Sequence, residues 1–109
     1  MKAYNRKNTL KLGLVTALVL APTLGFADQQ LALKRQCMSC HQIEARRVGP
    51  PFKAIAQRYS ANATAMAPVL ARKIRSGGKG TWGQVGMPAM SQVSEAEALQ
   101  LANWILQLR

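Results

Sequence analysis

The sequence contains few of the residues from which most catalytic and metal sites are built. Its 109 residues include two cysteines, one histidine and four acidic side chains. A structural zinc site needs four ligands, and these cysteines and this histidine supply only three. A disulfide between Cys37 and Cys40 would close a tiny loop and restrain little of the unfolded chain. We find no pairing of a nucleophile with a base, so we expect no enzyme activity.

The N-terminal apolar run is too short to cross a bilayer. It covers residues 12–24, which is 13 residues, whereas a transmembrane helix needs ~20. Four basic residues precede it, and Gly25-Phe26-Ala27 places small residues at the two positions that a signal peptidase reads. We therefore expect residues 1–27 to be a secretory signal peptide, cleaved after Ala27, and a retained membrane anchor is the alternative. The mature protein would be periplasmic, with 28–109 as its single domain and no stable membrane insertion.

The expected mature domain is basic and has little apolar mass. Removing the four basic residues of the signal leaves 11 basic against 4 acidic side chains, a net charge of +7. Export argues against nucleic acid as a partner, and the basic residues are not interleaved with aromatic ones. The charge therefore favours an acidic protein partner. A chain of 82 residues buries only a small core, which suggests that a large apolar cofactor completes the interior.

Four stretches have the pattern of helices, and none has the pattern of a strand. Ser94 and Glu97 form a capping box ahead of apolar residues that recur at i, i+3, i+4 and i+7. Residues 77–93 form a long glycine-rich loop, and such a loop in a small domain is usually functional. The predicted fold class is all-α, with about four helices. These helices cover 29–38, begin at Pro50-Pro51, run from Pro68 to Gly77-Gly78, and begin at Ser94.

Cys37-Met38-Ser39-Cys40-His41 is the C-x-x-C-H pattern of c-type haem attachment. Two thiols three residues apart on a turn can each add to one vinyl group of the same porphyrin. His41 then lies beneath the ring, with an imidazole nitrogen facing the iron. No strand pattern surrounds the motif, which argues against a thioredoxin-type dithiol. A periplasmic copper site that combines Cys37 and Cys40 with Met87 and Met90 is the alternative, but it leaves the small core unexplained.

The chain has no second histidine, which excludes bis-histidine ligation within one chain, so a methionine is the natural sixth ligand of the iron. Met87 precedes Pro88, which favours an extended backbone at Met87 and stiffens the loop around it. We predict Met87 as the ligand and take Met90 as the second candidate. Such His/Met ligation raises the reduction potential and leaves no open position on the iron. A gas- or peroxide-reactive haem protein, which needs an open position, is the alternative within the haem class.

Taken together, these features resemble the short periplasmic class I cytochromes c of bacteria, the type that donates electrons to nitrite reductases and terminal oxidases. The resemblance implies a small class I cytochrome c fold wrapped around one covalent haem. It also implies a monomer that shuttles single electrons between the redox proteins of a respiratory chain, through their acidic docking surfaces. The matching pieces span essentially all of 28–109, in family order: Cys37 to His41, Val48-Gly49-Pro50, Gly80-Thr81-Trp82-Gly83, Met87-Pro88, and Leu101 to Leu106.

The resemblance further implies roles for residues outside the cysteine motif. The backbone carbonyl of Pro50 would accept a hydrogen bond from His41, which orients the ring and raises its basicity. Trp82 and Lys73 would bind a haem propionate. The sequence departs from the family at residues 31–33, which lack the aromatic that many members carry in the first helix. It departs again at Met90, where many members have an asparagine able to hydrogen-bond near the ligand sulfur.

Overall fold

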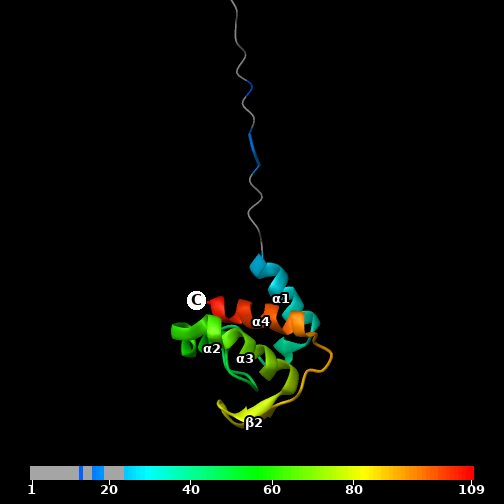
Figure 1. Cartoon of the computed structure of the whole chain (residues 1–109), viewed down its shortest axis with the longest axis vertical. Coiled ribbons are helices and arrows are strands. Elements are labelled where there is room, and N and C mark those ends of the chain that lie inside the picture. Colours follow the sequence, from blue (N-terminus) through cyan, green and yellow to red (C-terminus); the bar gives the residue numbers. More distant parts are fainter. Residues whose placement is uncertain (1–12, 14–15, 19–23) are drawn as a thin grey trace, which may run out of the picture.

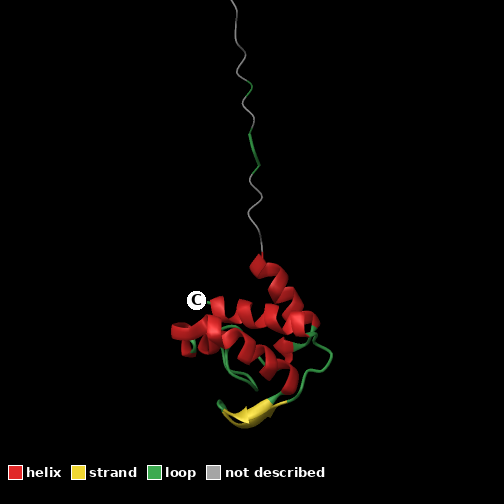
Figure 2. Cartoon of the chain, in the orientation of Figure 1, coloured by secondary structure: helices red, strands yellow, loops and turns green. Residues whose placement is uncertain are grey.

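The computed structural model describes residues 13, 16–18 and 24–109. The predicted signal peptide, 1–27, therefore lies mostly outside the described residues. The described part is predominantly helical, as predicted, with a small antiparallel hairpin at the end opposite the start of α1 (Figures 1 and 2). Its elements are α1 (Leu24–Lys34), the 3-10 turn η1 (Cys37–Ser39), α2 (Phe52–Arg58), the 3-10 turn η2 (Ser60–Asn62), α3 (Ala63–Ser76), β1 (Gly78–Gly80), β2 (Gly83–Met87) and α4 (Glu95–Gln107).

Helix α4 is the centre of the packing, because it contacts α1, α2 and α3 (Figure 1). The predicted capping box is present at its start. The Ser94 hydroxyl accepts a hydrogen bond from the Glu97 amide, and the Glu97 carboxylate accepts one from the Ser94 amide, both at 3.1 Å. The predicted apolar face is the core, since Ala98, Leu101 and Ala102 are at most 1% exposed. No helix in the described ranges is long and apolar enough to span a bilayer.

Helix α1 packs across α4 and ends earlier than predicted. We expected it to continue to residue 38, but it stops at Lys34. Gln36 has a φ of 63°, in the left-handed region, and this residue breaks the helix before η1 begins. Ala32 has no exposed surface, so the small side chains of this helix bring its backbone close to α4. The Arg35 guanidinium forms an ion pair with Glu97 at 2.7 Å, which joins the two helices.

Helix α3 begins five residues before Pro68, so the prediction that this proline opens the helix was wrong. Proline has no backbone N–H, and the carbonyl of Thr64 therefore has no i+4 donor. The helix tolerates this loss because Thr64 is exposed and water can reach its carbonyl. The predicted end is confirmed at Gly77, whose φ of 70° requires glycine. A Cβ at Gly77 would also overlap the carbonyl oxygen of Met87.

The expectation of no strands was wrong, because part of the predicted loop at 77–93 folds as a hairpin. Strands β1 and β2 pair antiparallel, with Gly78 opposite Met87 and Gly80 opposite Gly83. Their residues are mostly exposed and rich in glycine, so the alternation that marks a half-buried strand is absent. The hairpin places Met87 at the end of β2, where its backbone packs against the C-terminus of α3.

Candidate functional site

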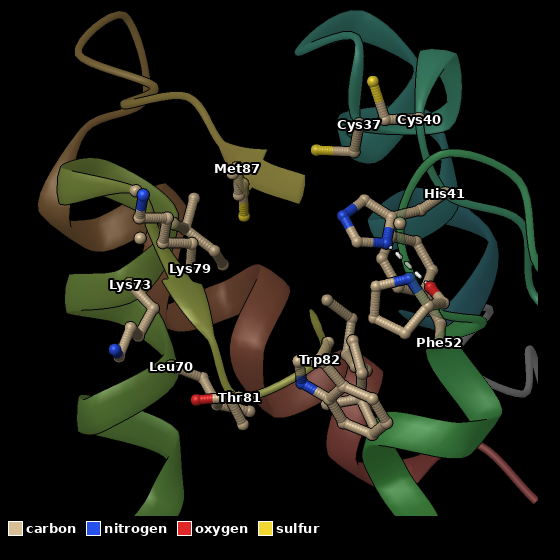
Figure 3. A pocket seen from close by; sticks show the side chains of 18 of the residues that line it. Cys37, Cys40, His41, Phe52, Leu70, Lys73, Lys79, Thr81, Trp82 and Met87 are labelled. Carbon is tan, nitrogen blue, oxygen red and sulfur yellow. Dashed lines mark hydrogen bonds between the residues drawn. The ribbon is translucent and has the colours of Figure 1, made fainter. Parts of the chain in front are cut away.

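A mostly apolar cavity lies between the helices and the hairpin (Figure 3). Side chains from α2, α3, α4, both strands and the segment around η1 line it. In α2 and α4, the lining residues belong to the apolar faces that the sequence periodicity predicted for these helices. Such a slot, with few polar atoms inside, suits a flat apolar group. The aliphatic and aromatic lining includes Phe52 and Ile55 of α2, Leu70 and Ile74 of α3, and Leu101 and Ile105 of α4.

Both cysteines of the motif line this cavity. The turn η1 holds them, because the amides of Cys40 and His41 both donate to the carbonyl of Cys37, at 3.2 and 3.0 Å. The cysteines are free and half-buried (Figure 3). Burial raises the pKa of the Cys37 thiol. This shift is opposite to the lowered pKa that a reactive dithiol of the thioredoxin type needs.

The imidazole of His41 is buried and has a fixed hydrogen bond. Its Nδ1 lies 2.8 Å from the carbonyl oxygen of Pro50. A carbonyl only accepts, so Nδ1 carries the proton and Nε2 is left with a lone pair. Figure 3 shows that second nitrogen pointing into the cavity. The geometry is that of a metal-ligating histidine whose other nitrogen is held by a backbone carbonyl. The hydrogen bond that the family resemblance implied for the Pro50 carbonyl is therefore present in the structure.

Backbone hydrogen bonds hold the loop that carries Pro50. The Gly49 amide donates to the Cys40 carbonyl at 2.8 Å, and the Phe52 amide donates to the Gln42 carbonyl at 2.9 Å. These two bonds close residues 42–51 into a loop whose ends meet beside the cysteine motif. The carbonyl of Pro50 is thereby placed on the Nδ1 side of His41.

Met87 lies across the cavity from His41, with its sulfur pointing inward (Figure 3). Met90, the second candidate ligand, does not line the cavity. Its amide donates to the Ile74 carbonyl at 3.2 Å, and the Gln92 amide group lies 3.9 Å from its sulfur. Its side chain packs against the core instead. The structure thus distinguishes between the two candidate methionine ligands, because only Met87 lines the cavity. It also weakens the copper alternative, which uses Met90.

The lysine and the tryptophan expected at the haem propionates both line the cavity. Trp82 is half-buried in the turn between the strands, and Lys73 is exposed on α3; both line the cavity. Sequence reasoning missed Arg46 and Lys79, which also line it. It also missed Arg58, whose guanidinium lies 4.9 Å from the centroid of the Trp82 ring. No local spacing signals these residues, because they meet only when separate segments fold together.

The described residues include no group of three or more histidine, cysteine or acidic side chains that could hold a metal ion by themselves. Two thiols and an imidazole at the rim of an apolar slot instead define a protein that holds a porphyrin covalently and ligates its iron. The cavity fits this group. Its walls are apolar, the Nε2 lone pair of His41 faces inward, and a methionine sulfur lies on the opposite side.

Comparisons with known proteins agree with this class. The family model for cytochrome c matches residues 28–109. Cytochrome c-552 of Hydrogenobacter thermophilus is 42% identical over 100 residues, which cover 92% of this chain and 100% of that one. Cytochrome c-552 of Nitrosomonas europaea is 48% identical over 83 residues, covering 76% and 80% of the two chains. The crystal structure of wild-type Nitrosomonas europaea cytochrome c552 matches with a TM-score of 0.71 and 47% identity, over 74% of this chain and 99% of that one.

The chain therefore belongs to the cytochrome c family. It carries haem c bound covalently, and its function is electron transfer through that haem. Cytochromes c exchange electrons with redox partners, and this chain shares that general mode of action.

Proposed function

We propose that the protein is a periplasmic carrier of single electrons, with His41 and Met87 as the axial ligands of a haem attached to Cys37 and Cys40. One observation carries the proposal: both thiols, the Nε2 of His41 and the sulfur of Met87 converge on a single apolar cavity (Figure 3). When bound there, haem supplies an iron that changes between the ferrous and ferric states. With both axial positions filled, no substrate can bind to iron, so we propose no enzyme activity.

The chain's own residues prepare the site for fast electron exchange. The Pro50 carbonyl holds the proton on Nδ1 of His41, which fixes the tautomer and raises the basicity of the ligating nitrogen. Apolar side chains exclude water and lower the dielectric constant around the iron, which disfavours the more charged ferric state. Trp82 and Lys73 are proposed to bind haem propionates. Arg46 and Lys79 add positive charge beside the same cavity.

The distribution of charge supports an acidic redox partner of a respiratory chain. Three glutamates are held in ion pairs, with Arg35, Lys53 and Arg75. In the part of the chain that the structure describes, the basic residues of the cavity lining, Arg46, Lys73 and Lys79, take no part in an ion pair. Apart from the charge that the haem propionates would neutralise, positive charge thus remains beside the cavity without a carboxylate partner among the described residues. A small, transient contact with an acidic surface fits this arrangement.

The proposal of export rests on the N-terminal sequence and on the start of the family match. The match begins at residue 28, directly after the predicted cleavage site at Ala27. N-terminal sequencing of protein recovered from the periplasm tests this point. A first residue of Asp28 supports the proposal, and a retained N-terminus contradicts it.

Spectroscopy of the exported, haem-loaded protein tests the ligand assignment. The ferric protein should show a charge-transfer absorption band from methionine sulfur to iron. Met87→Ala should abolish the band, and Met90→Ala should retain it, because Met90 packs outside the cavity. Tight carbon monoxide binding by the wild-type protein, without that band, would favour a gas-reactive haem protein instead. A polypeptide mass without added haem would contradict covalent attachment.

A further inference from the structure

The ring of His41 has a second neighbour besides the carbonyl of Pro50. The ring of Phe52 stacks on the imidazole, with centroids 4.9 Å apart and planes 19° from parallel. Phe52 is the first residue of α2 and only 2% exposed. Trp104 of α4 packs edge-on against the same phenyl ring, with centroids 5.5 Å apart and planes at 77°. Because Phe52 is held between His41 and the core, its ring has little freedom to tilt.

Gly49 is the third neighbour of the imidazole. A Cβ at this position would lie 2.6 Å from Cε1, 2.9 Å from Nδ1 and 3.0 Å from Nε2 of His41. Near-equal distances to three consecutive ring atoms place that Cβ over the ring rather than beyond its edge. Gly49 does not have a positive φ, so the glycine is required for space and not for backbone freedom. Its amide donates to the Cys40 carbonyl, which keeps its backbone close to the imidazole.

We propose that Phe52 and Gly49 are positioning residues that fix the rotation of the His41 imidazole about its bond to iron. The inference rests on the proposed role of His41 as an axial ligand. The hydrogen bond to Pro50 directs Nδ1, but hydrogen bonds to carbonyls accept a broad range of approach directions. Contacts on the face of the imidazole ring restrict its orientation more strongly, because close-packed neighbours leave no space into which the ring could rotate.

The rotation of an axial imidazole has an electronic consequence. The plane of the imidazole π system, together with the sulfur lone pair of the other axial ligand, sets the order of two iron d orbitals, and so influences how ferric spin spreads over the four haem methyl groups. The proton NMR spectrum of the ferric protein reports this spread directly. It therefore distinguishes a turned imidazole from a protein that is merely less stable.

Two variants change the imidazole contacts in opposite ways. Phe52→Leu removes the flat ring and frees the imidazole, whereas Gly49→Ala adds a methyl group that must push it aside. Leu106→Ala is the matched control, because Leu106 is 3% exposed in α4 but does not line the cavity. We expect both imidazole variants to change the order or the spread of the four haem methyl resonances. The control should lower the Tm and leave the resonances in the wild-type order.

The outcomes separate this inference from the proposed function. A wild-type spectrum without low-spin His/Met features would contradict the proposed function before any variant is considered. A normal wild-type spectrum whose methyl pattern survives in Gly49→Ala and Phe52→Leu would overturn the positioning role. A control that shifts the pattern as far as the two variants would overturn it as well. If Phe52→Leu does not retain haem, Gly49→Ala decides the question, because it removes no core volume.

Discussion

At the scale of single residues, Glu97 serves two helices at once. Its carboxylate caps α4 by accepting from the Ser94 amide, and it also accepts hydrogen bonds from Nη2 and Nε of Arg35, at 2.7 and 3.1 Å. The hydrogen bond with Arg35 lowers the pKa of Glu97 most, and the Ser94 amide lowers it further. An unfolded glutamate titrates at about pH 4.3. The folded carboxylate therefore stays ionised to a lower pH than the unfolded one, which links α1–α4 packing to pH.

We expect Glu97→Gln to lower the Tm at neutral pH and to weaken its dependence on acid. Because the folded pKa lies below the unfolded one, the stabilisation is present above about pH 4.3 and is lost as the pH falls through the folded pKa. Thermal melts between neutral and strongly acidic pH should show wild type and variant converging at the acid end. Glu95→Gln is the control, since Glu95 is 88% exposed in its ion pair and should change the Tm less. Parallel curves would contradict the expectation.

The residues of the site differ in how far they could be predicted from the sequence. Cys37, Cys40 and His41 are predictable because attachment chemistry fixes their spacing, and the structure brings all three to one cavity with Met87. The contact of Phe52 with His41 was not predictable. The helical pattern marked Phe52 only as a core residue, and the stacking depends on how a loop of ten residues returns to the cysteine motif. Stacking of this kind leaves no signal in residue spacing.

At the scale of elements, the predictions of helix and strand boundaries were correct where all the residues of the signal lie close together in the sequence. The capping box of α4 was predictable because both partners lie within one turn. The prediction from Pro68 was wrong because proline is commonest in the first helical turn, whereas here it lies inside the helix. The helix tolerates it because the carbonyl that loses its hydrogen bond is exposed to water. The hairpin of β1 and β2 was missed because its short, exposed strands carry no alternating pattern. Two arginines from outside the strands contact its turn.

Those arginines join the hairpin turn to the other side of the cavity. The Arg58 guanidinium of α2 covers the Trp82 ring at 4.9 Å and donates to the Thr81 carbonyl at 3.4 Å. Arg46, in the loop after His41, donates to the Trp82 carbonyl at 3.5 Å. The hairpin that carries Met87 is thus tied to the segment that carries His41 by contacts between side chains and backbone of the chain itself.

We expect Arg58→Met to destabilise the haem-loaded protein by about 0.5–1 kcal/mol, the usual range for an exposed cation–π contact. Methionine keeps a long apolar side chain but loses the charge over Trp82. Urea unfolding gives the free energy, and hydrogen exchange of the β1 and β2 amides should become faster. Arg72→Met on α3 is the control, because Arg72 is exposed and has no hydrogen bond or aromatic contact among the described residues. Equal losses in the two variants would argue against this contact.

At the scale of the whole molecule, the cavity lies inside the core instead of beside it. The inner faces of α2, α3 and α4 turn toward it, so their apolar side chains pack against one another and would also pack against a haem bound there. In an 82-residue domain this leaves little apolar contact that is independent of haem.

The haem-free chain should consequently be mostly disordered. We expect a Cys37→Ala/Cys40→Ala double variant to lose most of its helical circular dichroism, because the small core cannot offset the conformational entropy of folding. Met87→Ala is the control. It keeps both attachment thiols and should retain most of the helix signal. Full native helix content in the double variant would contradict this expectation.

The charge beside the cavity should make electron exchange sensitive to salt. We expect the rate with an acidic redox protein to fall as ionic strength rises from 0.01 to 1 M, because the screening length shortens from about 30 to about 3 Å. Stopped-flow kinetics measures the rate. Lys79→Gln should slow exchange at low salt, while Arg109→Gln, at the C-terminus and outside the cavity lining, should change it less. A rate independent of salt would contradict electrostatic docking.

The pairing of the glutamates has a practical consequence for how the molecule meets a solid surface. Because Arg46, Lys73 and Lys79 line the cavity while three carboxylates are paired elsewhere among the described residues, we expect the charge of the molecule to be unevenly distributed, with excess positive charge on the cavity side. A negatively charged electrode would attract and align it with the redox centre toward the metal. Direct voltammetry should then proceed on anionic monolayers and fail on cationic ones, without any mediator or linker.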